Sequence, residues 1–456
     1  MKKRRSNILM NLITVPAVRP VAISHRIVFG IAAPMTLAHL STPLLGLADT
    51  TVIGQLGDAA LIGAVAISAI LFDFLFWGFG FLRMGTAGLT AQALGAGDKL
   101  EQRAVFLRAL VMAAVLGLVV VALQKAIAAA AFPLLGGSPA VTTAAELYFA
   151  IRVWSAPFAF GNYAVLGWLI GMGRTTTGLF LQLGINVVNI LLCILFTLGL
   201  GWGVAGTAWA TTLAEIGGLL VGLVVVAAHF GGKFGVPAAR VFDKAKFVRM
   251  AAINRDIMLR TMALLAAFLF FARQGALAGD VTLASNSVLN NFFLVGGYFL
   301  DGVATAAEQL CGRSIGANNR RAFETAVRYS VLWSLALAVA MSALLFAAGG
   351  YFIDFMTSNT AVRDQARHFI AYAALTPLAG SLAFTFDGVY IGATWNAAMR
   401  NLMILALTTY FALWWFLQPF GNHGLWLALI GFLLARGAGQ ALAYPRLMPR
   451  AFAHVG

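Results

Sequence analysis

The sequence predicts an all-α membrane protein with twelve transmembrane helices in two homologous six-helix lobes. Hydrophobic residues make up 61% of the 456 residues and charged residues only 10%. That is more apolar surface than a water-soluble core could bury. The apolar residues gather in stretches close to the roughly 20 residues that cross a bilayer. The second half of the chain also repeats the first half.

The repeat has a constant offset of 221 residues. Gly95 corresponds to Gly316 near the end of one stretch, and Gly203 corresponds to Gly424 at the start of another. A single register across both halves indicates two copies of one structural unit. Duplicated, wholly hydrophobic chains of this kind are common among secondary transporters, which handle their substrate between the halves.

Each half contains six apolar stretches. An even number per half gives both copies the same orientation, so the pseudo-twofold axis is expected to run along the membrane normal. Each stretch is long enough to cross the hydrocarbon core at a rise of about 1.5 Å per residue. The predicted spans are 27–54, 60–92, 105–131, 145–170, 178–200, 204–228, 256–278, 283–311, 325–350, 366–391, 401–420 and 424–444.

The charges set the expected orientation. Most of the 31 Lys and Arg residues lie in the two tails, the middle connection and the even-numbered loops, so both termini are expected in the cytoplasm. The net charge of +15 is then topological, and no nucleic-acid partner is expected. The predicted parts are a cytoplasmic tail (1–26), an N-lobe (27–228), a cytoplasmic amphipathic linker (229–255), a C-lobe (256–445) and a cytoplasmic tail (446–456).

Enzyme and cofactor motifs are not found in the sequence. Cys193 and Cys311 have no CxxC or His partner, so neither a disulfide framework nor a metal site is expected. The chain has no GxxxxGK[ST] phosphate-binding loop and no HExxH. A GAGD string at Gly95 to Asp98 is reminiscent of some intramembrane aspartyl proteases, but its repeat copy is GANN, so we interpret it as a turn. No catalytic residue and no cofactor other than a coupling ion is expected.

Ionisable residues inside the spans are candidates for function, because a charge in hydrocarbon costs several kcal/mol. Most of them break the repeat, and Glu215 corresponds to Arg436, a change of sign. The scaffold is therefore duplicated while the chemistry is not, which suits an antiporter that distinguishes a proton from a cargo. The charged residues considered within the spans are Asp49, Asp73, Arg83, Glu215, Arg273, Asp301, Glu308, Asp387 and Arg436.

The segments around these charges resemble the DinF branch of the multidrug and toxic compound extrusion (MATE) family, over about residues 27 to 445. The resemblance implies two six-helix lobes in a V-shaped arrangement that opens alternately to the two sides of the membrane. It also implies export of amphipathic, often cationic compounds, driven by inward flow of protons or sodium. The segments are GLADTTVIGQLG (Gly46–Gly57), FLRMGTAGLTAQALGA (Phe81–Ala96), YFLDGVATAAEQLCGRSIGA (Tyr298–Ala317), FDGVYIGATWNAAMRN (Phe386–Asn401) and GNHGLWLALIGFLLARG (Gly421–Gly437).

In that family a carboxylate on the first helix usually couples transport to the ion, and the matching residue here is Asp49. Protonation would neutralise it and loosen its polar contacts. The alternative is an interfacial aspartate satisfied by Thr50, Gln55 or water.

The fifth helix departs from the family pattern. Many relatives carry Asn followed four residues later by Asp, whereas this chain has Asn189 followed by Cys193. Glu215 is then a possible substitute for the missing acid. Asn186 and Asn189 are expected to form hydrogen bonds across the lobe, either as contacts between helices or as cargo ligands.

The C-lobe offers a second group of acids. Asp301 and Glu308 are seven residues apart and share a helix face, which Asp387 could meet from the tenth helix. Together they could hold a proton, a sodium ion or a cationic cargo. Alternatively they form buried ion pairs. Arg83 is also expected to pair with an acid. The possible partners for the C-lobe acids are Arg273, Arg400 and Arg436.

The function predicted from these residues is proton-coupled export of small amphipathic or cationic organic compounds by a bacterial inner-membrane antiporter. The expected partners are such compounds and membrane lipid, and a monomer is expected. Sodium coupling remains an alternative. A second alternative is flipping of a lipid-linked precursor, an activity found in the wider superfamily, which would call for a more basic central cavity than Arg83 and Arg436 supply.

Overall fold

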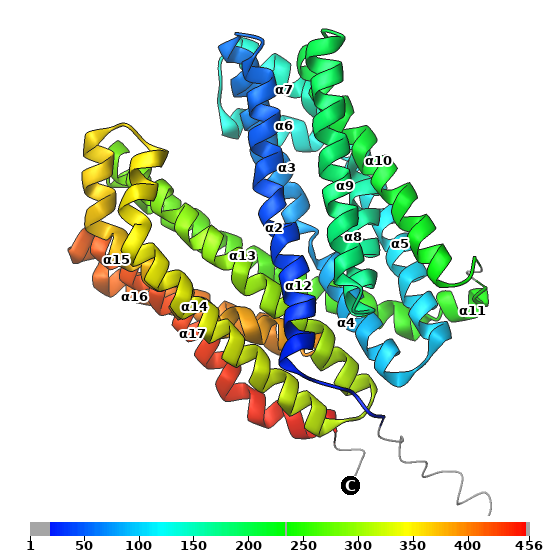
Figure 1. Cartoon of the computed structure of the whole chain (residues 1–456). Helices are drawn as coiled ribbons and strands as arrows, with labels where there is room; N and C mark the ends of the chain where they lie inside the picture. Colours follow the sequence, from blue (N-terminus) through cyan, green and yellow to red (C-terminus); the bar gives the residue numbers. More distant parts are fainter. Residues whose placement is uncertain (1–18, 233–234, 453–456) are drawn as a thin grey trace, which may run out of the picture. The chain divides into compact units, whose positions relative to one another are not determined.

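The computed structural model describes residues 19–232 and 235–452, and every regular element in this part of the chain is helical (Figure 1). Most of the predicted amino-terminal tail and the last four residues lie outside the described residues. The helices of the first half are α2 (His25–Gly54), α3 (Ala59–Gly78), α4 (Phe81–Ala96), α5 (Lys99–Ala122), α6 (Gln124–Leu135), α7 (Pro139–Arg152), α8 (Ala156–Gly171), α9 (Thr175–Ile194) and α10 (Gly203–His229). Those of the second half are α11 (Ala238–Val241), α12 (Lys244–Leu277), α13 (Asp280–Gly316), α14 (Arg320–Met356), α15 (Thr360–Gly392), α16 (Asn396–Leu417) and α17 (Gly421–Ala451).

The predicted all-α fold of twelve helices is confirmed within the described residues. Three predicted spans are each covered by two helices separated by a short break, namely α3 with α4, α5 with α6, and α7 with α8. Among residues 19–232 and 235–452, nine helical runs are long and apolar enough to cross a membrane, with α16 and α17 counted as one run. Helices α12 and α13 are not in this group.

The connection between the halves is shorter than the predicted linker at 229–255. Helix α12 begins at Lys244, well before the expected start at 256, because Asp243 Oδ1 accepts a hydrogen bond from the Lys246 backbone N–H at 3.2 Å and caps the helix. The Lys246 ammonium also donates to Glu101 Oε2 at 2.5 Å. Residues 233–234 of this connection lie outside the described residues.

The chain forms two compact units that do not follow the predicted lobe boundaries throughout. Unit 2 contains Gly30–Ala87 and Leu100–Ala266. Unit 1 contains the described residues up to Phe29, together with Gly88–Lys99 and the described residues from Ala267 onward. Each unit therefore consists mainly of one repeat, and the end of α4 packs with the second repeat.

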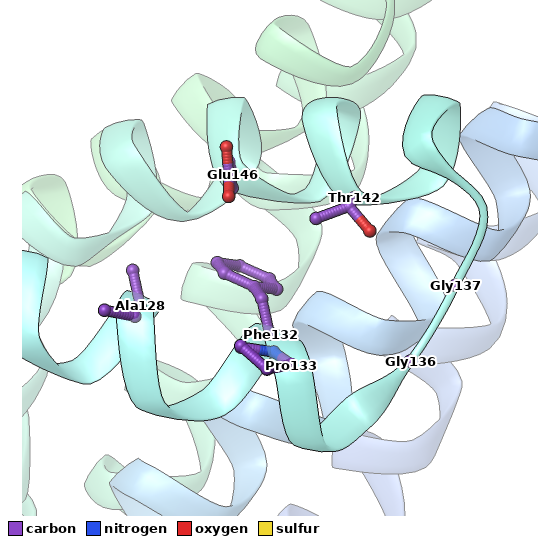
Figure 2. Close-up of a pocket in the computed structure, with 8 residues that line it drawn as sticks. Ala128, Phe132, Pro133, Gly136, Gly137, Thr142 and Glu146 are labelled. Atoms are coloured by element: carbon purple, nitrogen blue, oxygen red, sulfur yellow. The ribbon is translucent and has the colours of Figure 1, made fainter.

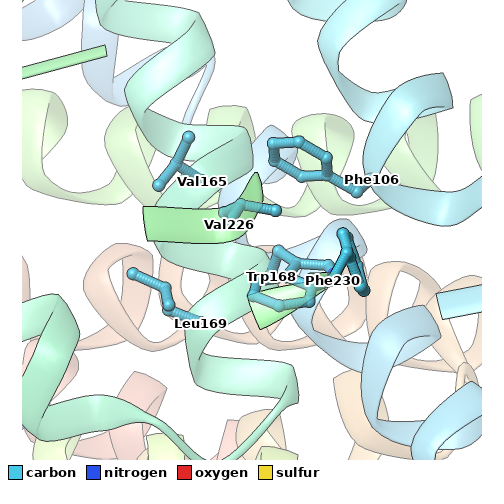
Figure 3. Packing of buried hydrophobic residues seen from close by; sticks show 6 residues of the cluster. All are labelled: Phe106, Val165, Trp168, Leu169, Val226 and Phe230. Atoms are coloured by element: carbon cyan, nitrogen blue, oxygen red, sulfur yellow. The ribbon is translucent and has the colours of Figure 1, made fainter. Parts of the chain in front are cut away.

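The core of unit 2 is an aromatic and aliphatic cluster where α5, α8 and α10 meet (Figure 3). Trp168 on α8 is fully buried, and its ring centroid lies 5.9 Å from that of Phe106 and 5.1 Å from that of Phe230. Its indole N–H donates to the Gln102 carbonyl oxygen at 3.1 Å, so the buried polar atom is satisfied. The cluster consists of Phe106, Val165, Trp168, Leu169, Val226 and Phe230.

In unit 1, the repeat-related glycines Gly95 on α4 and Gly316 on α13 make equivalent close contacts. A Cβ at Gly95 would lie 1.9 Å from the Arg313 carbonyl oxygen, and a Cβ at Gly316 would lie 1.9 Å from the Gln92 carbonyl oxygen. Gln92 and Arg313 are themselves related by the 221-residue offset. The contact therefore has the twofold symmetry of the repeat, and only glycine permits the two backbones to approach so closely.

We expect Gly316→Ala to destabilise the protein by about 1–3 kcal/mol, because the added methyl group must push α4 and α13 apart. The buried thiols of Cys193 and Cys311 allow unfolding to be followed with a thiol-reactive dye in detergent. The matched control is Gly350→Ala on α14, where a Cβ would meet nothing within 4 Å. Equal unfolding temperatures for the two variants would contradict the symmetric glycine contact.

Candidate functional site

Unit 2 contains a group of charged side chains around Arg152, which we call the N-terminal polar cluster. The side chains come from α2, α3, α7 and α10, and the charge of Arg152 interacts with all three acids of the group. Helices that are far apart in sequence thus bring their ionisable residues to one region of one unit. The cluster consists of Asp49, Asp73, Tyr148, Arg152 and Glu215.

Arg152 is held mainly by aromatic neighbours. It lies in the last turn of α7, where a cation also interacts favourably with the helix dipole. Its Nη1 donates to the Tyr148 hydroxyl at 3.0 Å, and its guanidinium carbon lies 4.5 Å from the centroid of the Phe72 ring. Among the described residues, its buried Nε has no hydrogen-bond partner. The positive charge is therefore shared among several acids instead of being neutralised by one.

Asp49 lies on α2 and is partly buried. Its Oδ1 is buried and accepts no hydrogen bond from the described residues, and the Cys193 side chain lies beside the carboxylate. The alternative of satisfaction by Thr50 is not supported, because the Thr50 hydroxyl donates to the Gly46 carbonyl oxygen at 2.9 Å. Asp49 thus interacts with the charge of Arg152 through space. In the described part of the chain, it has no hydrogen-bonded partner of opposite charge.

The two asparagines of α9 connect helices. Asn186 Nδ2 donates to the Ser41 hydroxyl of α2 at 3.0 Å, close to Pro43. Asn189 Nδ2 donates to the Thr211 hydroxyl of α10 at 3.1 Å. Interhelical hydrogen bonds of this kind are a common means of fixing helix packing in membranes. These contacts correspond to the first of the two expected roles, hydrogen bonding between helices.

Glu215 lies on α10 and belongs to the N-terminal polar cluster. Its Oε2 accepts a hydrogen bond from Asn162 Nδ2 at 2.6 Å. Cys193, which stands where many relatives carry an acid, contacts Thr207 at 3.7 Å. Glu215 therefore supplies a carboxylate to the cluster, as expected of a substitute, while its role in transport remains a prediction.

The expected ion pair of Arg83 is not seen within the described residues, and its role stays a prediction. Its Nη1 is buried and has no hydrogen-bond partner there. The charge of Arg83 interacts with the side chains of His39 and Tyr163. A Cβ at Gly167 of α8 would lie 2.3 Å from the Arg83 carbonyl oxygen, so the backbone of Arg83 is closely packed.

Unit 1 has its own group of charged and polar side chains, the C-terminal polar cluster, on α13, α15 and α17. Arg436 is 1% exposed, and its Nη2 donates to Asp387 Oδ2. Gln440 Nε2 donates to Asp387 Oδ1 at 2.7 Å, and the charge of Asp301 also interacts with Arg436. The cluster consists of Asp301, Phe384, Asp387, Arg436 and Gln440.

Part of the expected contacts of the C-lobe acids is present in the structure. Of the three arginines considered as partners, Arg436 pairs with Asp387, while Arg400 donates to Asn401 Oδ1 at 2.8 Å. Glu308 is buried, and its backbone carbonyl oxygen would lie 2.3 Å from a Cβ at Gly392 of α15. Whether Asp301, Glu308 and Asp387 bind an ion or a cargo remains a prediction.

Sequence reasoning overlooked Arg152 and Gln440. Arg152 lies inside the fourth predicted span, 145–170, so a complete count of ionisable residues within the spans would have identified it. Gln440 follows Arg436 by one helical turn and reaches the same carboxylate. No pattern in the sequence shows that Arg436 and Gln440 contact the same carboxylate, because Asp387 lies on another helix.

A separate pocket of about 310 Å³ lies between α6 and α7 in unit 2. In Figure 2, Phe132 lies between the helix that carries Ala128 and the helix that carries Thr142 and Glu146. None of the residues of the N-terminal polar cluster lines this pocket. The pocket is therefore distinct from the charged site.

We expect Asp387→Asn to destabilise the protein by about 3–5 kcal/mol, because it leaves the Arg436 charge buried without its carboxylate. Arg436→Gln combined with Asp387→Asn should recover part of that loss. The matched control is Glu324→Gln, which breaks the exposed Arg320–Glu324 pair at 2.9 Å and should cost no more than about 1 kcal/mol. Unfolding in detergent measures all of these variants, and equal losses for Asp387→Asn and Glu324→Gln would contradict a buried ion pair.

The MatE family profile matches residues 34–195 and 258–416, which is one match in each half. The chain is 35% identical over 426 residues to DNA damage-inducible protein F of Escherichia coli (strain K12), covering 93% of this chain and 92% of that protein. It is 26% identical to the probable multidrug resistance protein NorM of Caulobacter vibrioides, with 89% of each chain covered.

Solved structures show the same fold. A crystal structure of MATE in the bent conformation superposes with a TM-score of 0.85 at 18% sequence identity, covering 94% of this chain and 96% of that chain. Members of this family are membrane transporters and not enzymes. From the profile match in both halves and the similarity to the Escherichia coli protein, the chain belongs to the MATE family of multi-pass membrane transporters.

Proposed function

We propose that this transporter exports amphipathic or cationic organic compounds in exchange for protons by alternating access. The proposal rests on Asp49, whose buried carboxylate oxygen Oδ1 has no hydrogen-bond partner in the described part of the chain. A carboxylate in this state can change partners at low cost, whereas a hydrogen-bonded buried ion pair resists exchange. The similarity to a probable multidrug resistance protein supports organic compounds as the cargo.

In the proposed cycle, a proton and a cationic cargo compete for the N-terminal polar cluster. The cluster contains three acids and one arginine, and the charge of Arg152 interacts with each acid. A proton on Asp49 removes one negative charge, which weakens the attraction for a cation. Loss of the proton restores that attraction. Each ligand therefore favours release of the other, as antiport requires.

Arg152 is proposed to act as an internal counter-ion in this exchange. Its guanidinium rests on Phe72 and on the Tyr148 hydroxyl, so its position does not depend on any one acid. When the cluster is free of cargo, the fixed positive charge limits the cost of ionised acids in an apolar protein interior. An organic cation that enters must then compete with a resident charge, which keeps its binding weak enough for release.

The C-terminal polar cluster is proposed to contribute a second, less exchangeable site. Asp387 already accepts hydrogen bonds from Arg436 and Gln440. We therefore assign to this pair a mainly structural part, and to Asp301 and Glu308 a part in holding a cation or proton. One proton that moves down a membrane potential of about 150 mV releases roughly 3.5 kcal/mol, enough for a cargo gradient of a few hundredfold.

The location and orientation follow from the relatives and the charges. Two relatives described above come from bacteria, so we propose the bacterial inner membrane. The distribution of Lys and Arg supports cytoplasmic termini. A monomeric transporter is proposed, with the lobes at 27–228 and 256–445 as the parts that change position during transport.

We expect Asp49→Asn to abolish proton-driven transport of a fluorescent organic cation, because the amide can neither release a proton nor offer a negative charge to cargo. Uptake into inside-out vesicles with an imposed pH gradient or an imposed sodium gradient measures this. The control is Glu146→Gln, which changes an exposed carboxylate of α7 outside the cluster and should transport like the native chain.

The other outcomes have distinct meanings. Proton-driven transport that survives Asp49→Asn would move the coupling site to Asp301, Glu308 and Asp387. A sodium gradient that drives uptake when a pH gradient does not would replace the proton with sodium. No gradient-driven movement of any organic cation would favour movement of a lipid-linked precursor, which a dependence on lipid headgroup would reveal.

We expect Arg152→Gln to slow turnover strongly while it tightens equilibrium binding of the same organic cation by about tenfold. That is the size of the repulsion between unit charges roughly 10 Å apart at an effective dielectric constant of about 20. Fluorescence anisotropy in detergent measures binding, and vesicle uptake measures turnover. Arg152→Lys keeps the charge and should bind the cation like the native chain, so tightening by both substitutions would contradict a counter-ion role.

A further inference from the structure

Two histidines from different helices of unit 1 face each other near the starts of α15 and α17. Their Nε2 atoms, in His368 and His423, are 3.3 Å apart. Nδ1 of His423 lies 3.0 Å from the Tyr372 hydroxyl. His368 is exposed, and His423 and Tyr372 are partly exposed. None of these residues belongs to either polar cluster.

The separation of the two nitrogens suits a shared metal ion. In a tetrahedral site with Zn–N distances of about 2.0–2.1 Å, two ligand nitrogens lie about 3.3–3.4 Å apart. The observed 3.3 Å matches the separation of two nitrogens that bind one ion.

The surroundings hold His423 in the orientation that a metal ligand needs. A ligating imidazole commonly donates its other ring N–H to an oxygen, which fixes the tautomer and the ring. The Tyr372 hydroxyl is placed to accept from Nδ1 of His423. The Phe369 ring centroid lies 4.6 Å from that of His423 and supports its face. Nε2 of His423 is thereby directed at His368.

The charged side chains near the two histidines do not prevent a cation from binding. Asp364 precedes His368 by one turn on the same face of α15 and is exposed. Arg367, the neighbouring cation, donates to both carboxylate oxygens of Asp354 at 2.6 and 2.7 Å, so its charge is largely compensated. Among residues 19–232 and 235–452, no group of three or more histidine, cysteine, aspartate or glutamate side chains is placed to hold a metal. The pair therefore supplies two ligands, and water would complete the coordination.

We propose that His368 and His423 form a two-histidine site for a divalent transition-metal ion that prefers imidazole, such as Zn²⁺, Cu²⁺ or Ni²⁺. Imidazole is a ligand suited to these ions, whereas Mg²⁺ and Ca²⁺ prefer oxygen. Because one ligand lies on α15 and the other on α17, a bound ion would tie the starts of these two helices together.

The test uses the full-length chain without a polyhistidine tag, purified in detergent. Zn²⁺ is titrated in competition with a chromogenic chelator, and Cu²⁺ bound to the protein is examined by electron paramagnetic resonance. We expect one Zn²⁺ per chain, and two coupled nitrogens in the Cu²⁺ spectrum. His368→Gln and His423→Gln should each weaken Zn²⁺ binding at least about tenfold, and Tyr372→Phe should weaken it by about tenfold.

The matched control is His25→Gln. His25 also belongs to unit 1 and also packs in an aromatic group, stacked on Tyr329 at 4.0 Å between ring centroids, so its loss tests for an unspecific effect of removing a histidine. This variant should bind Zn²⁺ like the native chain. Zn²⁺ should also raise the Tm of the native chain and of His25→Gln, but not of His368→Gln or His423→Gln.

Two results would overturn the proposal. One is the lack of saturable Zn²⁺ binding by the native chain. The other is an affinity that His368→Gln and His423→Gln leave unchanged. In either case the two rings would only be hydrogen-bonded neighbours. The unfolding temperatures of the variants without metal show whether each is folded, so a loss of binding is not confused with a loss of structure.

Discussion

The close approach of α4 and α13 at Gly95 and Gly316 constrains much of unit 1. Each glycine packs against a backbone carbonyl of the other helix, and the two contacts are related by the internal repeat. In lipid, helices associate through close packing because the hydrophobic effect offers little preference between lipid and protein. Because no side chain separates the two backbones, many of their atoms are in van der Waals contact. The contact therefore leaves no room for an added methyl group. Residues of the first repeat are held in unit 1 through it.

Around this symmetric backbone the two repeats carry different charges. Arg152 corresponds to Ala373 in the second copy, and Arg436 corresponds to Glu215 in the first. Each unit thus has an arginine that interacts with acids, but on different helices and with different partners. The backbone packing thus has the symmetry of the repeat, whereas the buried charges do not.

The two arginines also differ in how they are satisfied. Arg436 is hydrogen-bonded to Asp387, and Gln440 occupies the other carboxylate oxygen. Arg152 is bonded to a tyrosine hydroxyl and rests on a phenylalanine ring, while three acids interact with it through space. The first arrangement resembles a structural ion pair, and the second leaves the acids able to change partners. This contrast supports the proposal that ion exchange takes place in unit 2.

The sequence by itself determined the class and the number of helices, because the length and hydrophobicity of each span are local properties. It also determined the repeat and the family resemblance, and it singled out Asp49, Asp387 and Arg436 as charges in unusual places. Three arginines remained open as partners for Asp387, and Arg152 was overlooked. Only the tertiary structure decided these points, because a side chain's neighbours depend on how each helix is rotated and packed against the others. The same holds for His368 and His423, which no local pattern joins.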